Sequence, residues 1–380
     1  DGMTWFDTPA ELAASDDIDV FVELMGGEDE PALGAVKAAL NAGKHVVTAN
    51  KALLAKHGVE LAQIAEDKGV LLNYEAAVAG GIPIIKVMRE SLTANAVTRV
   101  FGILNGTCNY ILTRMEAEGM TFEDCLADAQ KLGYAEADPT FDIEGNDTAH
   151  KLAILASLAF GTKIAGDAIY LEGITKITIA DIEAAADMGY RIKLLGVATR
   201  TATGVESRVH PAMVPLGSAI AEIGGVTNAV AVEADTVGSL MMSGPGAGGA
   251  ATASAVAGDI CDIAKSKPGR QPGPVLGQPA NTLGPHERSA MTAHEGGYFL
   301  RLNVVDQPGT MASIATRFAE QDISLESIVQ KRGDTDEGQA PIVLVTHETT
   351  EDAIGKALAG IESDGRLLGE AQMIRIEKLN

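Results

Sequence analysis

Short apolar runs alternate with amphipathic stretches over residues 1–76. Three runs are apolar enough to form buried strands: residues 19–24 (DVFVEL), 45–50 (HVVTAN) and 70–74 (VLLNY). Apolar positions at helical spacing predict helices from Pro31 to Gly43 and over 58–68. This alternation is typical of a parallel sheet in an α/β domain. Ligands bind beyond the carboxyl ends of such strands, and the residues predicted there are Gly26, Gly27, Asn50, Lys51 and Glu75.

The pattern changes after residue 76, and residues 77–250 predict a mixed α+β domain. The predicted helices are 107–117, 121–132 and 142–160, and the predicted strands lie around 97–104, 191–199, 205–209 and 228–234. The Gly-rich run 243–250 (SGPGAGGA) then opens a helix over 251–265. We expect that helix to return to the first domain.

The remaining residues divide into a linker and a small module. Residues 266–296 are rich in proline and glycine without apolar periodicity, which predicts a linker. Residues 297–380 alternate as strand, helix, strand, strand, helix, strand. That βαββαβ order is typical of a ferredoxin-like module.

Charge and cysteine content exclude several classes of function for this protein. The formal net charge is −23, which argues against nucleic acid and anionic membranes as partners, since both require clustered Lys and Arg. The three cysteines, Cys108, Cys125 and Cys261, are widely spaced, so neither a disulfide framework nor a structural zinc site is expected. Such cysteine use predicts a reducing cytoplasm. No apolar run is long enough for a membrane span.

Asp147 and Lys151 are the strongest candidates for chemistry. They lie four residues apart in the predicted helix 142–160, on the face that continues to Leu155 and Leu158. The pair therefore lies on the apolar stripe, where an ion pair is costly unless it is well satisfied. A buried lysine is the kind of group that proteins tune for proton transfer. The alternative is an ordinary helix salt bridge.

Four other features have both a functional and a structural reading. Lys51 could orient a cofactor or substrate oxygen, or it could cap a helix. The small-residue loop from Glu75 to Pro83 could offer carbonyls to a monovalent cation, or form a tight turn. The run Gly244–Gly249 could admit a phosphate or nicotinamide, or allow close backbone packing. Thr107 could reach a ligand, or lie in a helix-capping turn.

Several segments together resemble the homoserine dehydrogenase family. The segments are VFVELMGG, KHVVTANKALLA, NYEAAVAGGIPII and FGILNGTCNYIL. The most specific match runs from Ala129 through Gly133-Tyr134-Ala135, Asp138-Pro139 and Asp142-Ile143-Glu144-Gly145-Asn146-Asp147 to Lys151. The C-terminal GYFLRLNVVDQPGTMASIA resembles an ACT domain, the amino-acid-sensing module found at the end of many members of the family.

The resemblance implies a fold and a reaction. The fold would be a Rossmann-type α/β domain (1–76), an α+β catalytic and dimerisation domain (77–250) and a ferredoxin-like ACT domain (297–380). The reaction would be reversible NAD(P)H-dependent reduction of L-aspartate 4-semialdehyde to L-homoserine, in threonine, methionine and isoleucine biosynthesis. Threonine would be the feedback effector, and the assembly would be a homodimer or homotetramer.

The resemblance also implies residue roles. Lys151 would be the proton donor and acceptor, assisted by Asp147. The substrate-binding residues would be Asp147, Glu136, Asp142 and Thr107, with Glu136 suited to the substrate ammonium. The positions near the cofactor would be Lys51, Asn50, Gly133 and Gly249. A sodium ion would be held by Glu75, Val78, Gly80 and Ile82, mainly through carbonyls. The effector contacts would be Asp306, Gly309 and Ile323.

The chain departs from the family at its start. The family's first strand, its Gly-rich phosphate-binding turn and the next strand, whose end distinguishes NAD from NADP, have no counterpart here. We therefore expect an N-terminally truncated chain, lacking a βαβ unit of at least ~30 residues, with weak cofactor binding or none. Two alternative functions remain open: another ACT-linked amino-acid dehydrogenase, and a non-catalytic threonine sensor.

Overall fold

The computed structural model describes residues 2–266, 273–330 and 338–378, and begins with a parallel sheet. Its strands are β1 (Val20–Glu23), β2 (His45–Thr48) and β3 (Leu72–Asn73), in the order β1-β2-β3 and parallel throughout. The helices of this part are α1 (Pro9–Ala14), α2 (Ala32–Asn41), α3 (Lys51–Lys68) and α10 (Gly249–Lys265). The predicted α/β arrangement is confirmed, and α10 packs against β2.

α3 and α10 both begin earlier than predicted. α3 begins at Lys51 rather than at residue 58, because Asn50 caps it: the Asn50 side chain accepts a hydrogen bond from the Leu53 amide at 3.1 Å. α10 begins at Gly249 rather than at residue 251. Lys51 therefore lies in the first turn of a helix whose N-terminus is at the carboxyl edge of the parallel sheet.

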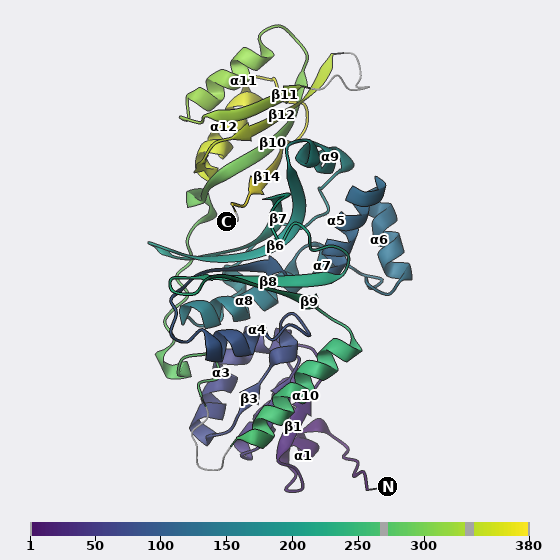
Figure 1. The fold of residues 1–380 in the computed structure, drawn as a ribbon, viewed down its shortest axis with the longest axis vertical. Coiled ribbons are helices and arrows are strands. Elements are labelled where there is room, and N and C mark those ends of the chain that lie inside the picture. Colours follow the sequence, from purple (N-terminus) through teal and green to yellow (C-terminus); the bar gives the residue numbers. More distant parts are fainter. Residues whose placement is uncertain (1, 267–272, 331–337, 379–380) are drawn as a thin grey trace.

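The middle of the chain forms an antiparallel sheet with helices packed on it (Figure 1). Its strands are β4 (Val97–Ile103), β6 (Tyr190–Thr201), β7 (Gly204–Pro215), β8 (Thr227–Ala234) and β9 (Gly238–Pro245), in the order β7-β6-β4-β8-β9. The short β5 (Tyr170–Leu171) pairs in parallel with β7. The helices are α5 (Gly106–Glu118), α6 (Phe122–Lys131), α7 (Thr140–Ile143), α8 (Asn146–Phe160) and α9 (Ile179–Asp187). Sequence reasoning missed α1, α9 and β9; the Gly-rich run concealed the end of β9.

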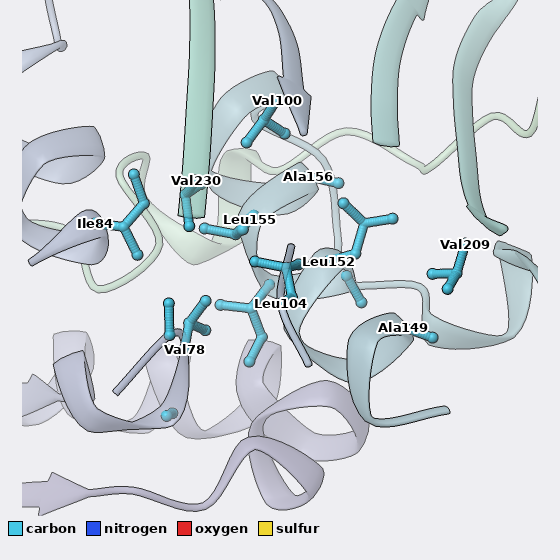
Figure 2. Close-up of a cluster of buried hydrophobic side chains, with 14 of the residues drawn as sticks. Val78, Ile84, Val100, Leu104, Ala149, Leu152, Leu155, Ala156, Val209 and Val230 are labelled. Carbon is cyan, nitrogen blue, oxygen red and sulfur yellow. The ribbon is translucent and has the colours of Figure 1, made fainter. Parts of the chain in front are cut away.

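The predicted helix 142–160 is divided in two. Gly145 takes a left-handed conformation, with φ of +88°, and separates α7 from α8. Figure 2 shows Ala149, Leu152, Leu155 and Ala156 of α8 facing the apolar cluster that includes Val100, Val209 and Val230 of the sheet. Asp147 and Lys151 are therefore fixed by a helix that is itself packed in the core.

The connection between the parallel sheet and β4 is made of short helical segments. They are η1 (Glu75–Ala77), α4 (Ile84–Lys86) and the π-helical η2 (Val87–Ser91). Elsewhere the short segments are η3 (Gly166–Ala168), η4 (Ala280–Thr282) and η5 (Met291–Ala293). Within the described residues, no helix is both long and apolar enough to cross a bilayer.

The C-terminal module has the predicted βαββαβ order. It consists of β10 (Glu295–Val305), α11 (Thr310–Ala319), β11 (Leu325–Gln330), β12 (Gln339–Thr346), the short β13 (Thr349–Thr350), α12 (Glu351–Ser363) and β14 (Gln372–Ile376). The sheet order is β11-β12-β10-β14. Its edge strand β14 also pairs in parallel with β7, so the module continues the sheet of the middle domain. The sequence did not predict that junction.

The predicted linker is packed against the rest of the molecule where it is described. Val275, Leu276, Ala280 and Leu283 are buried, and the Tyr74 hydroxyl donates to the Val275 carbonyl at 2.8 Å. The Glu66 carboxylate also accepts from the backbone amides of Val275 and Ala280. Residues 273–294 are thus a fixed connection rather than a free spacer, while residues 267–272 lie outside the described part.

Candidate active site

Lys151 is held in place by two acceptors. Its Nζ donates to the Leu104 carbonyl at 2.6 Å and to Asp147 Oδ2 at 2.7 Å. Leu104 follows β4, so the strand end and the first turns of α8 meet at the amine. Lys151 is only 8% exposed and Asp147 only 5%. The pair is therefore a buried, hydrogen-bonded site and not a solvated helix salt bridge.

The Asp147 carboxylate lies against the positive charges of both Lys151 and Lys51. Burial alone would raise its pKa, but the charges of Lys151 and Lys51 and hydrogen bonds from Lys151 and Asn105 lower the pKa to about 2. Lys51 Nζ lies 3.2 Å from Asp147 Oδ1. One carboxylate thus contacts two lysines, one from α8 and one from α3 on the parallel sheet.

Asn105 joins the two candidate aspartates. Its Nδ2 donates to Asp142 Oδ1 and to Asp147 Oδ2, both at 2.8 Å, while its Oδ1 caps α5. Burial and the charge of Asp147 raise the pKa of Asp142, and the Asn105 hydrogen bond opposes that shift. The Thr107 hydroxyl donates to the Tyr134 carbonyl at 2.6 Å. Sequence reasoning treated Asn105 only as part of a capping turn and missed its bridging role.

The end of β2 is tied to the loop after β1. Asn50 Nδ2 donates to the Gly27 carbonyl at 2.7 Å. The buried Glu23 carboxylate accepts from the Thr48 hydroxyl at 2.6 Å and from the Met25 amide at 2.6 Å. Glu23 was also missed, although a carboxylate inside an apolar strand run is the signal that could have identified it.

His150 is a third residue that sequence reasoning missed. It lies beside Lys151 on α8, with its ring 5.3 Å from that of Phe141 in an edge-on contact. Its Nδ1 is buried and has no hydrogen-bond partner among the described residues. Burial first, and then the charge of Lys51, lower its pKa. The structure thus places an imidazole with a lowered pKa beside Lys151 on α8.

Five of the predicted substrate and cofactor residues make no hydrogen bond or ion pair with this cluster in the described part of the chain. Thr107 and Asn50 bond instead to Tyr134 and Gly27. Glu136 lies in the exposed loop between α6 and α7, and its carboxylate makes no ion pair in the described part of the chain. Gly133 follows α6 with φ of +76°, and Gly249 begins α10. Space beside both glycines is open.

The small-residue loop is a packed turn with available carbonyls. Ala79 and Gly80 have left-handed φ values of 56° and 54°, and a Cβ on Gly80 would lie 2.5 Å from the Gly246 carbonyl. The Gly-rich run 244–249 therefore packs against this loop, the structural alternative considered above. Within the described residues, the carbonyls of Val78 and Gly80 have no hydrogen-bond partner, whereas those of Glu75 and Ile82 accept from Val78 and Ile84.

The Glu75 side chain has a separate role. Its carboxylate accepts from the Ile85 and Lys86 amides at 2.8 and 2.9 Å, and its own amide donates to Asp259 at 2.9 Å. Burial raises the pKa of Glu75 to about 7 and also raises the pKa of Asp259. The side chain therefore holds the turn to α4, so only backbone oxygens of this turn could hold a cation.

The three effector candidates lie in the C-terminal module. Asp306 and Gly309 are in the loop between β10 and α11, where Gly309 has φ of +91°. Ile323 is 6% exposed, and its amide donates to the Phe318 carbonyl at 3.0 Å. β11 begins at Leu325, two residues after Ile323.

Comparison with known proteins agrees with this arrangement. The homoserine dehydrogenase family model matches residues 83–261, the model of the homoserine dehydrogenase NAD-binding domain matches 5–75, and the ACT domain model matches 298–363. A homoserine dehydrogenase from Pseudomonas aeruginosa is 48% identical, over 97% of this chain and 86% of that protein.

Solved structures give the same result. A homoserine dehydrogenase from Thiobacillus denitrificans superposes with a TM-score of 0.93 at 45% identity, over 98% of this chain and 85% of that one. A hyperthermophilic archaeal homoserine dehydrogenase in complex with NADPH has a TM-score of 0.59 at 28% identity, over 70% of this chain and 77% of that one. The chain belongs to the homoserine dehydrogenase family, with an NAD-binding domain, a catalytic domain and a C-terminal ACT domain.

Proposed function

We propose that this homoserine dehydrogenase interconverts L-homoserine and L-aspartate 4-semialdehyde at the Asp147–Lys151 pair, with Lys151 moving the proton of the substrate oxygen. The observation that carries this proposal is the buried Lys151 amine, fixed by Leu104 and Asp147 at 2.6 and 2.7 Å. A lysine ammonium has three N–H donors. Two are used by these acceptors, which leaves one for a substrate oxygen.

The residues divide the chemical work between them. In the reducing direction, the Lys151 ammonium gives a proton to the oxygen of the aldehyde; in the oxidising direction, the neutral amine takes the proton from the hydroxyl. Asp147 fixes the Lys151 Nζ through the 2.7 Å bond and balances its charge. A bound nicotinamide dinucleotide supplies the hydride chemistry.

Substrate and cofactor would approach this pair from different elements. Asp142, Glu136 and Thr107 would hold the amino-acid part of the substrate, and the carboxylate of Glu136 is free to pair with an ammonium. Lys51, Asn50, Gly133 and Gly249 would line the dinucleotide site, which would bind NADP or NAD. Gly26 and Gly27 support this placement of the dinucleotide. Both have positive φ and open space around them, and they lie at the sheet edge where dinucleotides bind.

The turn after β3 would hold a sodium ion. Val78 and Gly80 would offer carbonyl oxygens that have no other partner in the described residues, with Glu75 and Ile82 completing the set through their backbones. Oxygen ligands are what hard cations prefer. The ion would stiffen the connection between the two domains.

The ACT domain would bind threonine as a feedback effector, with Asp306, Gly309 and Ile323 as candidate contacts. Burial of Ile323 favours a role for its backbone. We also propose a homodimer or homotetramer. The free thiols of Cys108, Cys125 and Cys261 are consistent with function in the cytoplasm.

Substitution of Lys151 tests the central role. Lys151→Ala is expected to lower kcat for homoserine oxidation by roughly 10²- to 10⁴-fold, the usual contribution of general acid–base catalysis, while dinucleotide affinity measured by calorimetry is unchanged. The matched control is Lys356→Ala, because Lys356 forms an exposed i,i+4 pair with Asp352 on α12. Near-parental turnover in Lys151→Ala would remove Lys151 from the role. Threonine binding without nucleotide binding or turnover in the parent would favour the sensor.

A further inference from the structure

A buried arginine of the ACT domain reaches into the catalytic domain. Arg375 on β14 is fully buried and pairs through Nε and Nη2 with the Glu351 carboxylate of α12, at 2.7 and 2.8 Å. Its remaining nitrogen, Nη1, donates to Glu172 Oε2 at 2.8 Å, and its guanidinium lies over the Tyr170 ring at 5.0 Å. Arg375 therefore belongs to the ACT domain but also holds residues 170–172 of the catalytic domain.

The segment that Arg375 holds continues directly to the active site. We call residues 170–175 the strap, and residues 142–147 the α7–α8 turn. The Ile174 amide donates to the Ile143 carbonyl at 2.9 Å, and the Thr175 hydroxyl donates to Glu144 Oε1 at 3.1 Å. A Cβ on Gly173 would lie 2.4 Å from the Ile143 carbonyl, so the strap lies flat against the turn.

The α7–α8 turn carries both aspartates of the site. Asp142 and Asp147 lie on either side of Gly145, which contacts the Val209 side chain of β7. β7 also pairs with the strap, since the Glu172 amide donates to the Val209 carbonyl at 2.9 Å. A shift of the strap would therefore act on the turn directly and through β7.

The chain after the strap has its own attachment to the ACT domain. Asp181 on α9 is fully buried and accepts from Arg301 of β10, with Nε at 2.6 Å. Arg301 Nη2 also donates to Asp181 at 3.1 Å. Residues 170–181 thus have ionic contacts with β14 and β10 and backbone contacts with the α7–α8 turn.

We propose that the strap couples the ACT domain to the substrate site, and that Glu172 is a positioning residue of the dehydrogenase reaction. The ion pair with Arg375 fixes the strap, and the strap fixes the turn that carries Asp142 and Asp147. When the effector binds, a change in the ACT sheet moves Arg375. Through the strap, this movement displaces the α7–α8 turn. This inference rests on the proposed substrate site and on the proposed effector role of the ACT domain.

Glu172→Gln tests the coupling with little risk to the fold. Glutamine keeps the length and one acceptor oxygen but loses the charge, while Arg375 keeps both bonds to Glu351. We expect the KM for homoserine to rise roughly fivefold and the half-inhibiting threonine concentration to rise by a similar factor, the lower end of usual coupling strengths. The KM for the dinucleotide and the Kd of threonine, measured by calorimetry, stay at parental values.

Two further variants separate coupling from a general effect of charge. Glu370→Gln removes a carboxylate that pairs with Lys176, the residue after the strap, but this pair lies in solvent, with the Glu370 side chain 87% exposed. We expect parental kinetics. Thr175→Val removes the hydrogen bond at the other end of the strap. It should raise the KM for homoserine in the same way, and its effect should not add to that of Glu172→Gln, because both act on one segment.

Hydrogen exchange gives a readout that does not depend on turnover. In Glu172→Gln, amides of residues 143–147 should exchange faster than in the parent, while amides of α3 should not change. Unchanged exchange at the turn would overturn the coupling, as would equal changes in the KM for homoserine and for the dinucleotide. If the parent itself does not turn over homoserine or respond to threonine, the proposed function fails, and the exchange experiment still decides whether the strap holds the turn.

Discussion

Asp147 contacts two lysines that lie a hundred residues apart in the chain, Lys51 and Lys151. The Asp147–Lys151 contact was predictable, because four residues of helix bring both side chains to one face. The contacts of Asp147 with Lys51 and Asn105 were not, since they arise only when three elements meet. Spacing therefore identified the buried Asp147–Lys151 contact but not the groups that compensate its charge.

The ionisation of Asp147 predicts an acid dependence of stability. Its pKa is about 2 when folded, below the ordinary value of 3.8. The charged form therefore stabilises the fold above about pH 4, by on the order of 2 kcal/mol, and this contribution is lost as the pH falls toward 2. Asp147→Asn should lack it, so the difference in unfolding free energy between parent and variant should shrink between about pH 6 and about pH 3.

Urea unfolding at stepped pH measures this difference, and Asp364 supplies the control. Hydrogen bonds from Arg317 and Ser313 also lower the pKa of Asp364, but that pair is exposed to solvent. Solvent screening leaves such pairs with little effect on stability, so Asp364→Asn should follow the parent curve closely. A pH-independent difference between the parent and Asp147→Asn would contradict the assigned ionisation.

At the scale of elements, the α7–α8 turn is where sequence patterns were least informative. Apolar spacing runs continuously through residues 142–160 and predicts one helix, since periodicity does not register a single left-handed residue. The left-handed Gly145 lies too close to Val209, far away in sequence, for a side chain to fit without a shift. Sequence patterns also missed β9, because its Gly-rich end packs on the turn at Gly80, which is distant in sequence.

Gly145→Ala is expected to destabilise the enzyme and to raise the KM for homoserine. Its φ is +88°, and a Cβ would lie 2.8 Å from Val209 Cγ1. Strain of this kind costs about 1–3 kcal/mol, and its relief would displace Asp147. The matched control is Gly69→Ala, since Gly69 has φ of +66° with open space around it.

Urea unfolding measures the loss of stability in Gly145→Ala, and homoserine kinetics measure the change in KM. Gly69→Ala should lose stability without a change in KM, whereas Gly145→Ala should lose both. Val209→Ala combined with Gly145→Ala should recover part of the loss, because it removes the contacting methyl groups. Equal behaviour of the two glycine variants would show that the Val209 contact is unimportant.

At the scale of the whole molecule, the sequence predicted three modules but not how they join. Each module follows from local periodicity, whereas the parallel pairing of β14 with β7 joins residues 375–376 to residues 212–213. Beside this junction, Glu377 is 5% exposed and pairs with Arg208 at 2.6 Å and Arg99 at 2.5 Å. Polar residues in strands gave only a weak signal of this contact, because charged groups in strands usually face solvent.

Glu377→Gln should loosen the ACT domain from the catalytic sheet. Burial alone would raise the pKa of Glu377, but Arg208, His210 and Arg99 hold it well below its ordinary value of 4.5. Its stabilising contribution is therefore present above that value and is lost as the pH falls below it. Removing the charge takes one carboxylate partner from each of two guanidinium groups, while Arg208 keeps Glu206 and Arg99 keeps Glu233. The cost should therefore stay below the roughly 3–5 kcal/mol of a fully broken buried pair.

Hydrogen exchange at neutral pH shows which strands lose stability in Glu377→Gln. Amides of β7 and β14 should exchange faster in Glu377→Gln, while amides of β1 and β2, in the parallel sheet, should keep parental rates. The control is Glu348→Gln, because Glu348 pairs with Lys378 at the surface, with the two side chains 66% and 69% exposed. Uniformly faster exchange over the whole chain would show that Glu377 supports overall stability rather than the junction. Parental rates at β14 would show that strand pairing holds the ACT domain without the buried charges, because the β7–β14 hydrogen bonds would then suffice.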